Sequence, residues 1–127
     1  MNIKRFEDLE CWKEARYLAM KIYASIKNSD FRRDEVLSDE ITGASVSIMD
    51  NICKGFDSGS DHDFSRFLSY SRRACSEVQN FLYIALDQKY IDRESFRAVY
   101  RRCEKLRSMI DSLISVLNNQ KAIYRVK

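Results

Sequence analysis

The sequence predicts an all-α protein, an antiparallel four-helix bundle with up-down-up-down connectivity. The 127 residues contain no proline and only three glycines, so the strongest helix breaker is absent. Apolar side chains recur every three or four residues along four long segments, which is the period of a helix and not of a strand. The connections between these segments are short, and short connections make neighbouring helices antiparallel. A chain of this length is expected to fold as a single domain over residues 1–127.

The first helix is predicted over about residues 8–28, and the second over about residues 35–55. The inward positions of the first helix are Trp12, Ala15, Ala19, Ile22 and Ile26. The second helix carries two apolar stripes. One is Ile41, Ala44 or Ser45, Ile48 and Ile52, and the other is Val46, Met49 and Cys53. A helix in a small monomeric bundle needs only one stripe, so the second favours self-association, although a wide stripe in a tight core would also explain it.

The third helix is predicted over about residues 60–88, and the fourth over about residues 92–119. Ser60 with Asp63 resembles a capping pair for the third helix, and Asp92 is a suitable N-cap for the fourth. Seven inward positions follow the helical period in the third helix: Phe64, Leu68, Ser71, Cys75, Val78, Leu82 and Ala85. Seven more form an a/d pattern in the fourth: Phe96, Val99, Cys103, Leu106, Ile110, Leu113 and Leu117. The tail from Lys121 to Lys127 shows no pattern and is expected to fray.

Positive charge is concentrated in the second half of the chain. Residues 1–63 carry nine Lys and Arg against thirteen Asp and Glu, whereas residues 64–127 carry thirteen against six. The candidate binding residues for nucleic acid or a partner are Arg66, Arg72 and Arg73 on the third helix and Arg93, Arg97, Arg101 and Lys105 on the fourth. Such rows can follow phosphates, but a net charge of +3 is also compatible with an ordinary solvated face. Exposed tyrosines, among Tyr70, Tyr83, Tyr100 and Tyr124, could stack on unpaired bases, although packing is the commoner role.

The candidate residues for assembly and helix geometry are Val46, Met49, Asn51, Cys53 and Gly55. Asn51 lies among apolar residues, so its amide is expected to bond backbone groups or to fix the register of an assembly. Gly55 is expected to end the second helix at positive φ.

No catalytic residue, metal site or cofactor is predicted. His62 is the single histidine, and no nucleotide-binding or nucleophile motif is present. The four cysteines lack the spacing of zinc modules, so they are expected to be reduced core residues, with a metal-binding bundle as a remote alternative. No apolar run is long enough for a membrane span and no signal peptide is evident, so a cytoplasmic protein without a membrane partner is expected.

The stretch Ser47-Ile48-Met49-Asp50-Asn51-Ile52-Cys53-Lys54-Gly55 resembles the Ser-Ile-x-x-Asn-Ile-Ala-Glu-Gly motif of the four-helix-bundle proteins encoded by intervening sequences in bacterial 23S rRNA genes. Phe6-Glu7-Asp8-Leu9 with Trp12, Arg66-Phe67-Leu68 and Tyr90-Ile91 agree with the same family, so the resemblance covers residues 6–117. The chain departs from the family pattern at Lys54 and Cys53, at Glu40, at Thr42 and Gly43 in place of a basic pair, and at Arg73 and Ala74.

The resemblance implies a bacterial, cytoplasmic, non-enzymatic homo-oligomer, typically a pentamer. Similar bundles are accessory variability proteins of retroelements, where they bind a reverse transcriptase and nucleic acid. The sequence therefore leaves two functions open: binding of RNA or DNA, or of an enzyme that acts on them, through the basic faces of the third and fourth helices, or a protein-interaction scaffold without nucleic-acid binding.

Overall fold

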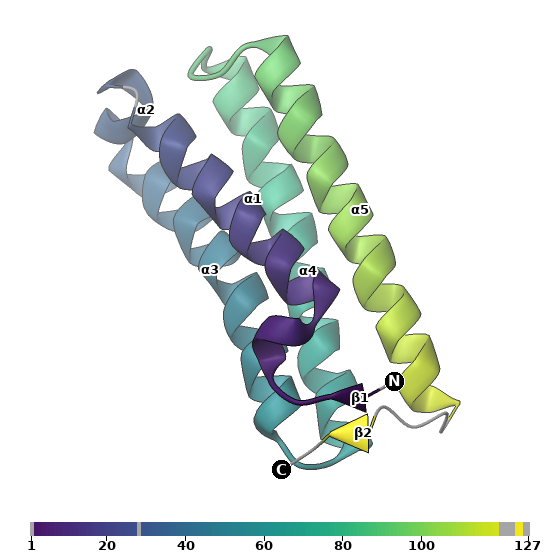
Figure 1. The fold of residues 1–127 in the computed structure, drawn as a ribbon. Coiled ribbons are helices and arrows are strands. Elements are labelled where there is room, and N and C mark those ends of the chain that lie inside the picture. The colour runs from purple at the N-terminus through teal and green to yellow at the C-terminus, as the bar shows by residue number, and fades with distance from the viewer. Residues whose placement is uncertain (1, 28, 120–123, 126–127) are drawn as a thin grey trace.

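The computed structural model describes residues 2–27, 29–119 and 124–125, and it confirms the four-helix bundle (Figure 1). The long helices are α1 (Glu10–Ile26), α3 (Glu35–Asp57), α4 (Asp61–Asp87) and α5 (Arg93–Asn118). α3 packs against α1 and α4, and α5 packs against the same two helices. α3 and α5 therefore lie at opposite corners of the bundle (Figure 1).

Two of the predicted caps are confirmed. The Ser60 hydroxyl accepts a hydrogen bond from the Asp63 N–H at 3.1 Å, and the Asp92 carboxylate accepts one from the Ser95 N–H at 2.8 Å. The hydrogen bond from the Ser95 backbone lowers the pKa of Asp92. A third cap was not predicted: Asp34 accepts from the Leu37 N–H at 3.0 Å and begins α3.

The predicted inward positions of α4 and α5 form the core, with Phe96 as the one partly buried member. Ser71 is accommodated because its hydroxyl donates to the Ile48 carbonyl of α3 at 2.8 Å. In α1 the prediction was less accurate. Cys11 and Leu18 are buried, whereas Trp12 is only partly buried and packs edge-on against Phe6 with ring centroids 5.2 Å apart.

The region predicted as a plain connection at residues 29–34 contains a short helix, α2 (Ser29–Arg33). Phe31 is buried, and its ring stacks on Tyr90 with centroids 5.3 Å apart. The Tyr90 hydroxyl also donates to the Asp34 carboxylate at 2.9 Å, which raises the pKa of Tyr90. These contacts fasten α2 to the turn between α4 and α5.

Two short strands, one near each end of the chain, pair with each other. β1 (Asn2–Ile3) runs parallel to β2 (Tyr124–Arg125), and a 3-10 helix, η1 (Phe6–Asp8), leads from β1 to α1. Most of the tail that was expected to fray lies outside the described residues. At Tyr124 and Arg125 the backbone instead pairs with Asn2 and Ile3.

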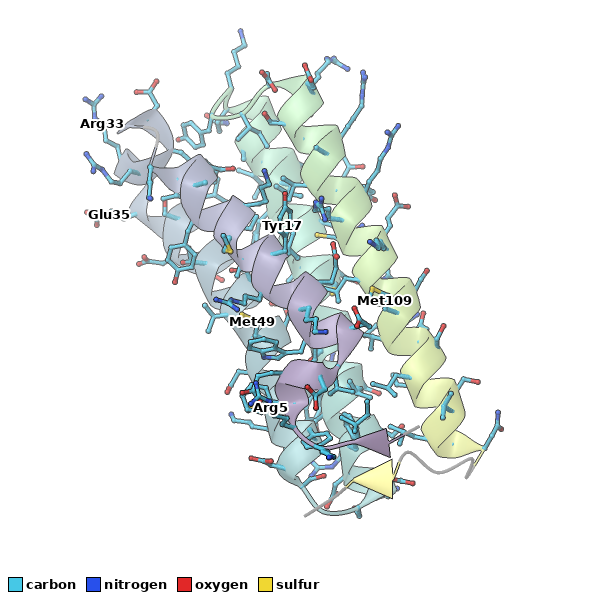
Figure 2. The ribbon with its side chains drawn as sticks, in the orientation of Figure 1. Arg5, Tyr17, Arg33, Glu35, Met49 and Met109 are labelled. Carbon is cyan, nitrogen blue, oxygen red and sulfur yellow. The ribbon has the colours of Figure 1, made fainter. Side chains whose placement is uncertain are left out.

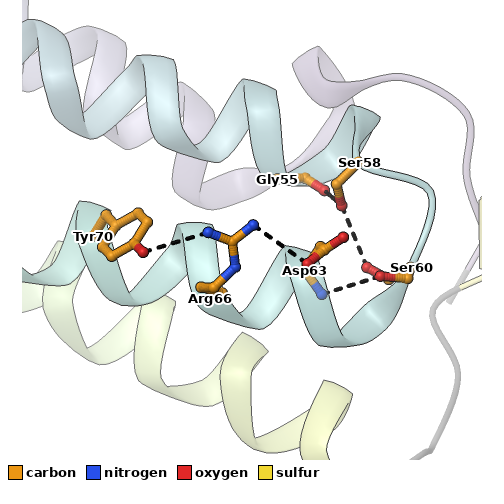
Figure 3. Close-up of polar contacts among 6 residues, drawn as sticks. All are labelled: Gly55, Ser58, Ser60, Asp63, Arg66 and Tyr70. Carbon is orange, nitrogen blue, oxygen red and sulfur yellow. Dashed lines mark hydrogen bonds and ion pairs between the residues drawn. The ribbon is translucent and has the colours of Figure 1, made fainter.

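Gly55 does not end α3, so that prediction was wrong. The helix continues to Asp57, and the turn that follows uses Gly59 with φ of 87°. Gly55 is needed for a different reason: a Cβ there would lie 2.9 Å from both Phe64 Cδ1 and Phe67 Cβ of α4. The missing side chain allows α4 to pack closely on α3 at this end of the bundle. The Ser58 hydroxyl donates to the Gly55 carbonyl at 2.6 Å and closes the helix end (Figure 3).

Candidate nucleic-acid interface

Three arginines follow one another along the exposed surface of α5. Arg93, Arg97 and Arg101 are four residues apart, so each lies about one turn from the next. All three side chains are exposed. Within the part of the chain that the structure describes, none of them has a carboxylate oxygen within 4.0 Å. This group, the α5 arginine row, presents three positive charges that form no ion pair in the described structure.

Lys105 was predicted as the fourth member of this row, but it lies toward α1. Its Nζ is 3.6 Å from Glu14 of α1, and Arg102 binds the same carboxylate at 2.8 Å. The Glu14 side chain is only 13 % exposed, whereas that of Lys105 is 63 % exposed, so the carboxylate is sheltered and the lysine is not. The Arg102 guanidinium also lies 3.9 Å from the centroid of Tyr17, which Figure 2 labels on α1. Lys105 is therefore partly neutralised by a contact between helices.

Two of the three arginines of α4, Arg66 and Arg72, form ion pairs. Arg66 donates to Tyr70 Oη at 3.4 Å and binds Asp63 at 3.3 Å (Figure 3), and these hydrogen bonds raise its pKa. Arg72 forms an ion pair with Asp111 of α5 at 2.6 Å. Arg73 has no carboxylate partner among the described residues, and its guanidinium lies 5.6 Å from the Tyr70 ring centroid. This group is more neutralised than the α5 arginine row.

The two arginine groups do not form one continuous surface. Because α4 and α5 are antiparallel, Ser65 hydrogen-bonds Asn118 at 3.1 Å near one end, whereas Tyr83 contacts Phe96 near the other. Arg66 therefore lies at the level of the C-terminal end of α5, and Arg93 lies at its N-terminal end. The sequence-based prediction placed all seven basic residues on the faces of α4 and α5 without this separation.

An aromatic cluster adjoins the α5 arginine row. Tyr83 of α4 lies 4.9 Å from Phe96 and 5.9 Å from Tyr100 between ring centroids, and Phe96 lies 5.4 Å from Tyr100. Phe96 and Tyr100 are partly buried, but Tyr83 is 50 % exposed. The neighbouring hydroxyl of Tyr83 raises the pKa of Tyr100. The sequence suggested stacking only for single tyrosines; their association with Phe96 depends on the pairing of two helices.

The predicted assembly stripe of Val46, Met49 and Cys53 is partly exposed, with Val46 at 45 %. Asn51 lies two residues from Met49, which places it on the other side of α3. Its amide donates to the Ser47 carbonyl at 2.9 Å and to Ser47 Oγ at 3.0 Å, so the expectation that it bonds a backbone group is confirmed. A role in fixing the register of an assembly stays a prediction.

The surface of α3 is acidic and faces away from α5. Its exposed carboxylates are Glu35, Asp39, Glu40, Asp50 and Asp57. The single basic residue of this helix, Lys54, binds Asp50 at 2.9 Å. Because α3 and α5 occupy opposite corners, the molecule has an acidic side and a basic side.

Three of the four cysteines are core residues, as predicted, whereas Cys53 is only partly buried. Cys11, Cys75 and Cys103 are buried, and burial raises the pKa of Cys11 and of Cys75 to about 12 and that of Cys103 further. Among the described residues, no group of three or more His, Cys, Asp or Glu side chains could hold a metal ion. His62 is exposed in the first turn of α4.

An open groove of about 480 Å³ lies between the beginning of α1 and the second half of α5. Its lining is mostly apolar, with Asp8 and Glu10 as the charged residues. It offers no positive charge to a phosphate, so it does not extend the candidate interface.

The family model of the 23S rRNA-intervening sequence proteins matches residues 7–112, which include α1, α3, α4 and most of α5. The chain belongs to this family. A similar solved structure is a protein of unknown function from the S23 ribosomal protein family of Bacteroides thetaiotaomicron. It has 20% sequence identity and a TM-score of 0.76, and the alignment covers 83% of this chain and 95% of that one. No curated protein is significantly similar to the chain.

At this level of identity, the likeness to the Bacteroides structure supports the bundle fold alone. The family resemblance inferred from the Ser47–Gly55 motif is confirmed by the family match. None of the helices in the described ranges is long and apolar enough to cross a membrane.

Proposed function

We propose that the protein is a non-enzymatic, homo-oligomeric bundle that binds nucleic acid, alone or together with an enzyme such as a reverse transcriptase, through the α5 arginine row. The observation that supports this proposal is the set of three exposed guanidinium groups without carboxylate partners in the described structure. Arginine side chains bind phosphate oxygens, and the release of counterions from the nucleic acid favours association. The proposed setting is the bacterial cytoplasm.

One protomer offers only a small basic surface, so assembly is an essential part of the proposal. A ring would repeat the α5 arginine row in every subunit and raise the local density of positive charge. The exposed apolar residues Met20 and Tyr23 on α1 and Val46 on α3 provide contact area for association. The acidic α3 side of one subunit is complementary in charge to the basic side of another. The number of subunits, five in the prediction, is to be measured as mass by light scattering.

The test compares two double variants that remove the same charge. Arg97→Ala with Arg101→Ala removes two members of the α5 arginine row, and Lys4→Ala with Arg5→Ala removes two positive charges at the far end of the bundle, where Figure 2 labels Arg5. Binding of fluorescent RNA and DNA is measured by anisotropy over a range of salt concentrations. We expect the first variant to bind more weakly and to lower the salt slope by about two, because each phosphate contact contributes about 0.9 to that slope. The control should bind like the wild type.

Equal loss in both variants would show a general charge effect and contradict the assigned surface. Binding by the wild type that does not depend on salt would also contradict it.

The second candidate function is a protein-interaction scaffold, favoured by the same exposed apolar residues of α1 and α3. A stable oligomer that fails to bind RNA and DNA would support the scaffold. A stable monomer at micromolar concentration would remove the proposed assembly.

A further inference from the structure

The aromatic cluster of Tyr83, Phe96 and Tyr100 and the α5 arginine row share one surface. On a helix, residues three and four apart are neighbours, so Arg93 adjoins Phe96 and Arg97 adjoins Tyr100. The cluster lies between α4 and α5, since Tyr83 comes from α4. Aromatic rings and arginine side chains without ion-pair partners therefore occur together near the N-terminal end of α5.

Tyr83 combines exposure with a fixed position. Half of its surface is exposed, while the centroid of its ring lies 4.9 Å from that of Phe96 and 5.9 Å from that of Tyr100. A ring that is held in this way loses little conformational freedom when a planar ligand stacks on it. Phe96 and Tyr100 are partly buried, and both rings contact the ring of Tyr83.

We propose that this surface selects single-stranded nucleic acid, with an unpaired base stacked on Tyr83 and the neighbouring phosphates bound by Arg93 and Arg97. The inference rests on the proposed function, because the same arginines supply the phosphate contacts. In a duplex each base face is covered by its neighbours, so Tyr83 can contribute to binding only when bases are unstacked. Stacking on an aromatic ring depends little on base identity, so the expected preference is for strand state and not for sequence.

Three carboxylates restrict the site. Glu104 lies four residues after Tyr100 and raises its pKa, and Asp87 lies four residues after Tyr83. The third is Glu94, which is exposed three residues before Arg97. The bound strand is therefore expected to follow the arginines, on the side of the cluster away from Glu104 and Asp87.

The test uses the full chain, a labelled single strand of about 20 nucleotides and a duplex of the same length. This length exceeds the binding site of one small domain. Both RNA and DNA are used, at equal salt. We expect the wild type to bind the single strands more tightly. Tyr83→Leu, which keeps the apolar bulk but removes the ring, should weaken single-strand binding by about tenfold and leave duplex binding and the salt slope unchanged. Tyr83→Phe keeps the ring and should bind nearly like the wild type.

A second measurement leaves the protein unaltered. Single-stranded DNA that contains 5-iodouracil is bound and irradiated, and the cross-linked peptide is identified by mass spectrometry. We expect the cross-link at Tyr83, or at Phe96 or Tyr100 beside it. A cross-link confined to other residues would overturn the inference even if Tyr83→Leu failed to fold.

The outcomes separate the two proposals. If the wild type binds no nucleic acid, the proposed function fails and the inference fails with it. If binding depends on Arg97 and Arg101, but Tyr83→Leu changes nothing or weakens single strands and duplexes equally, the proposed function stands and the selectivity for single strands is refuted.

Discussion

Gly55 offers the sharpest test of the packing between α3 and α4. Replacing it by alanine adds one methyl group at a point where the ideal Cβ would lie 2.9 Å from Phe64 Cδ1 and 2.9 Å from Phe67 Cβ. Carbon atoms in contact are ordinarily about 3.5–4.0 Å apart, so the two helices must separate or the phenylalanines must move. Phe64 is fully buried, and the Phe67 contact is made at Cβ, next to the backbone, where a change of rotamer gives no relief.

The magnitude follows from two opposing effects. Overpacking of a core by one methyl group costs about 1–3 kcal/mol, and these two rigid contacts favour the upper half of that range. Alanine is favoured over glycine inside a helix by about 1 kcal/mol. We therefore expect Gly55→Ala to lower the free energy of unfolding by about 1–2 kcal/mol.

Gly43 provides the matched control in the same helix. It is exposed, and a Cβ there would meet no atom within 4 Å. Gly43→Ala should therefore raise the free energy of unfolding by up to about 1 kcal/mol through the helical preference of alanine. Both variants are compared with the wild type by urea denaturation, at one protein concentration so that self-association contributes equally. The reasoning is refuted if Gly55→Ala stabilises the protein as Gly43→Ala does.

Three further predictions concern a turn and the thiols. Lys89 follows the end of α4 with φ of 61°, a backbone conformation that favours glycine. The Tyr90 N–H donates to the Ala85 carbonyl and the Lys89 N–H donates to the Leu86 carbonyl, so this turn closes the helix end. Lys89→Gly should therefore raise the free energy of unfolding in urea by about 1 kcal/mol, whereas Gln88→Gly, at φ of −81°, should lower it; the opposite order would contradict the assignment. At pH 8 a thiol reagent should modify Cys53 in the native protein and the other three cysteines only after unfolding, and rapid native modification of all four would refute their burial. Burial in the folded state raises the pKa of Cys75 from 9.0 to about 12. The contribution of this thiol to the free energy of unfolding is therefore complete below pH 9 and decreases as the pH rises toward 12. Urea denaturation should accordingly show a steeper alkaline loss of stability in the wild type than in Cys75→Ala.

The fold was largely predictable because local patterns and long-range packing agree. In α4 and α5 the apolar period, the Ser60 cap and the Asp92 cap all indicate the same helices, and the predicted bounds differ from the observed ones by only one residue at each end. The assignment of α2 could not be made in this way. Its five residues are too short for a pattern, and its order comes from the contact of Phe31 with Tyr90, 59 positions further along the chain.

Gly55 illustrates a different limit. The sequence places a glycine near a helix end, and the usual reason for a glycine there is positive φ. The actual reason is the approach of another helix, which no local pattern reveals.

The candidate interface required the structure because charge neutralisation occurs between helices. A row with a spacing of four residues predicts that Arg93, Arg97, Arg101 and Lys105 are equivalent, yet only Lys105 contacts a carboxylate of α1. The reason lies in the sequence of α1, whose acidic residues, Glu10 and Glu14, are confined to its first two turns. The antiparallel packing of α1 on α5 places Glu14 beside the middle of α5, at Arg102 and Lys105, and Glu10 beside its second half.

The N-terminal half of α5 lies instead against the later turns of α1. There the groove between the two helices is lined by Lys21, Ala24 and Ser25 of α1, none of which is acidic, together with Ser95 and Ala98 of α5. No carboxylate of α1 is therefore available to Arg93, Arg97 or Arg101. On the other side of this half of α5, the neighbour from α4 is Tyr83, an aromatic residue. The uneven distribution of charge along α1 thus leaves the α5 arginine row without a carboxylate partner from α1, beside the aromatic cluster, and the proposed interface rests on this combination.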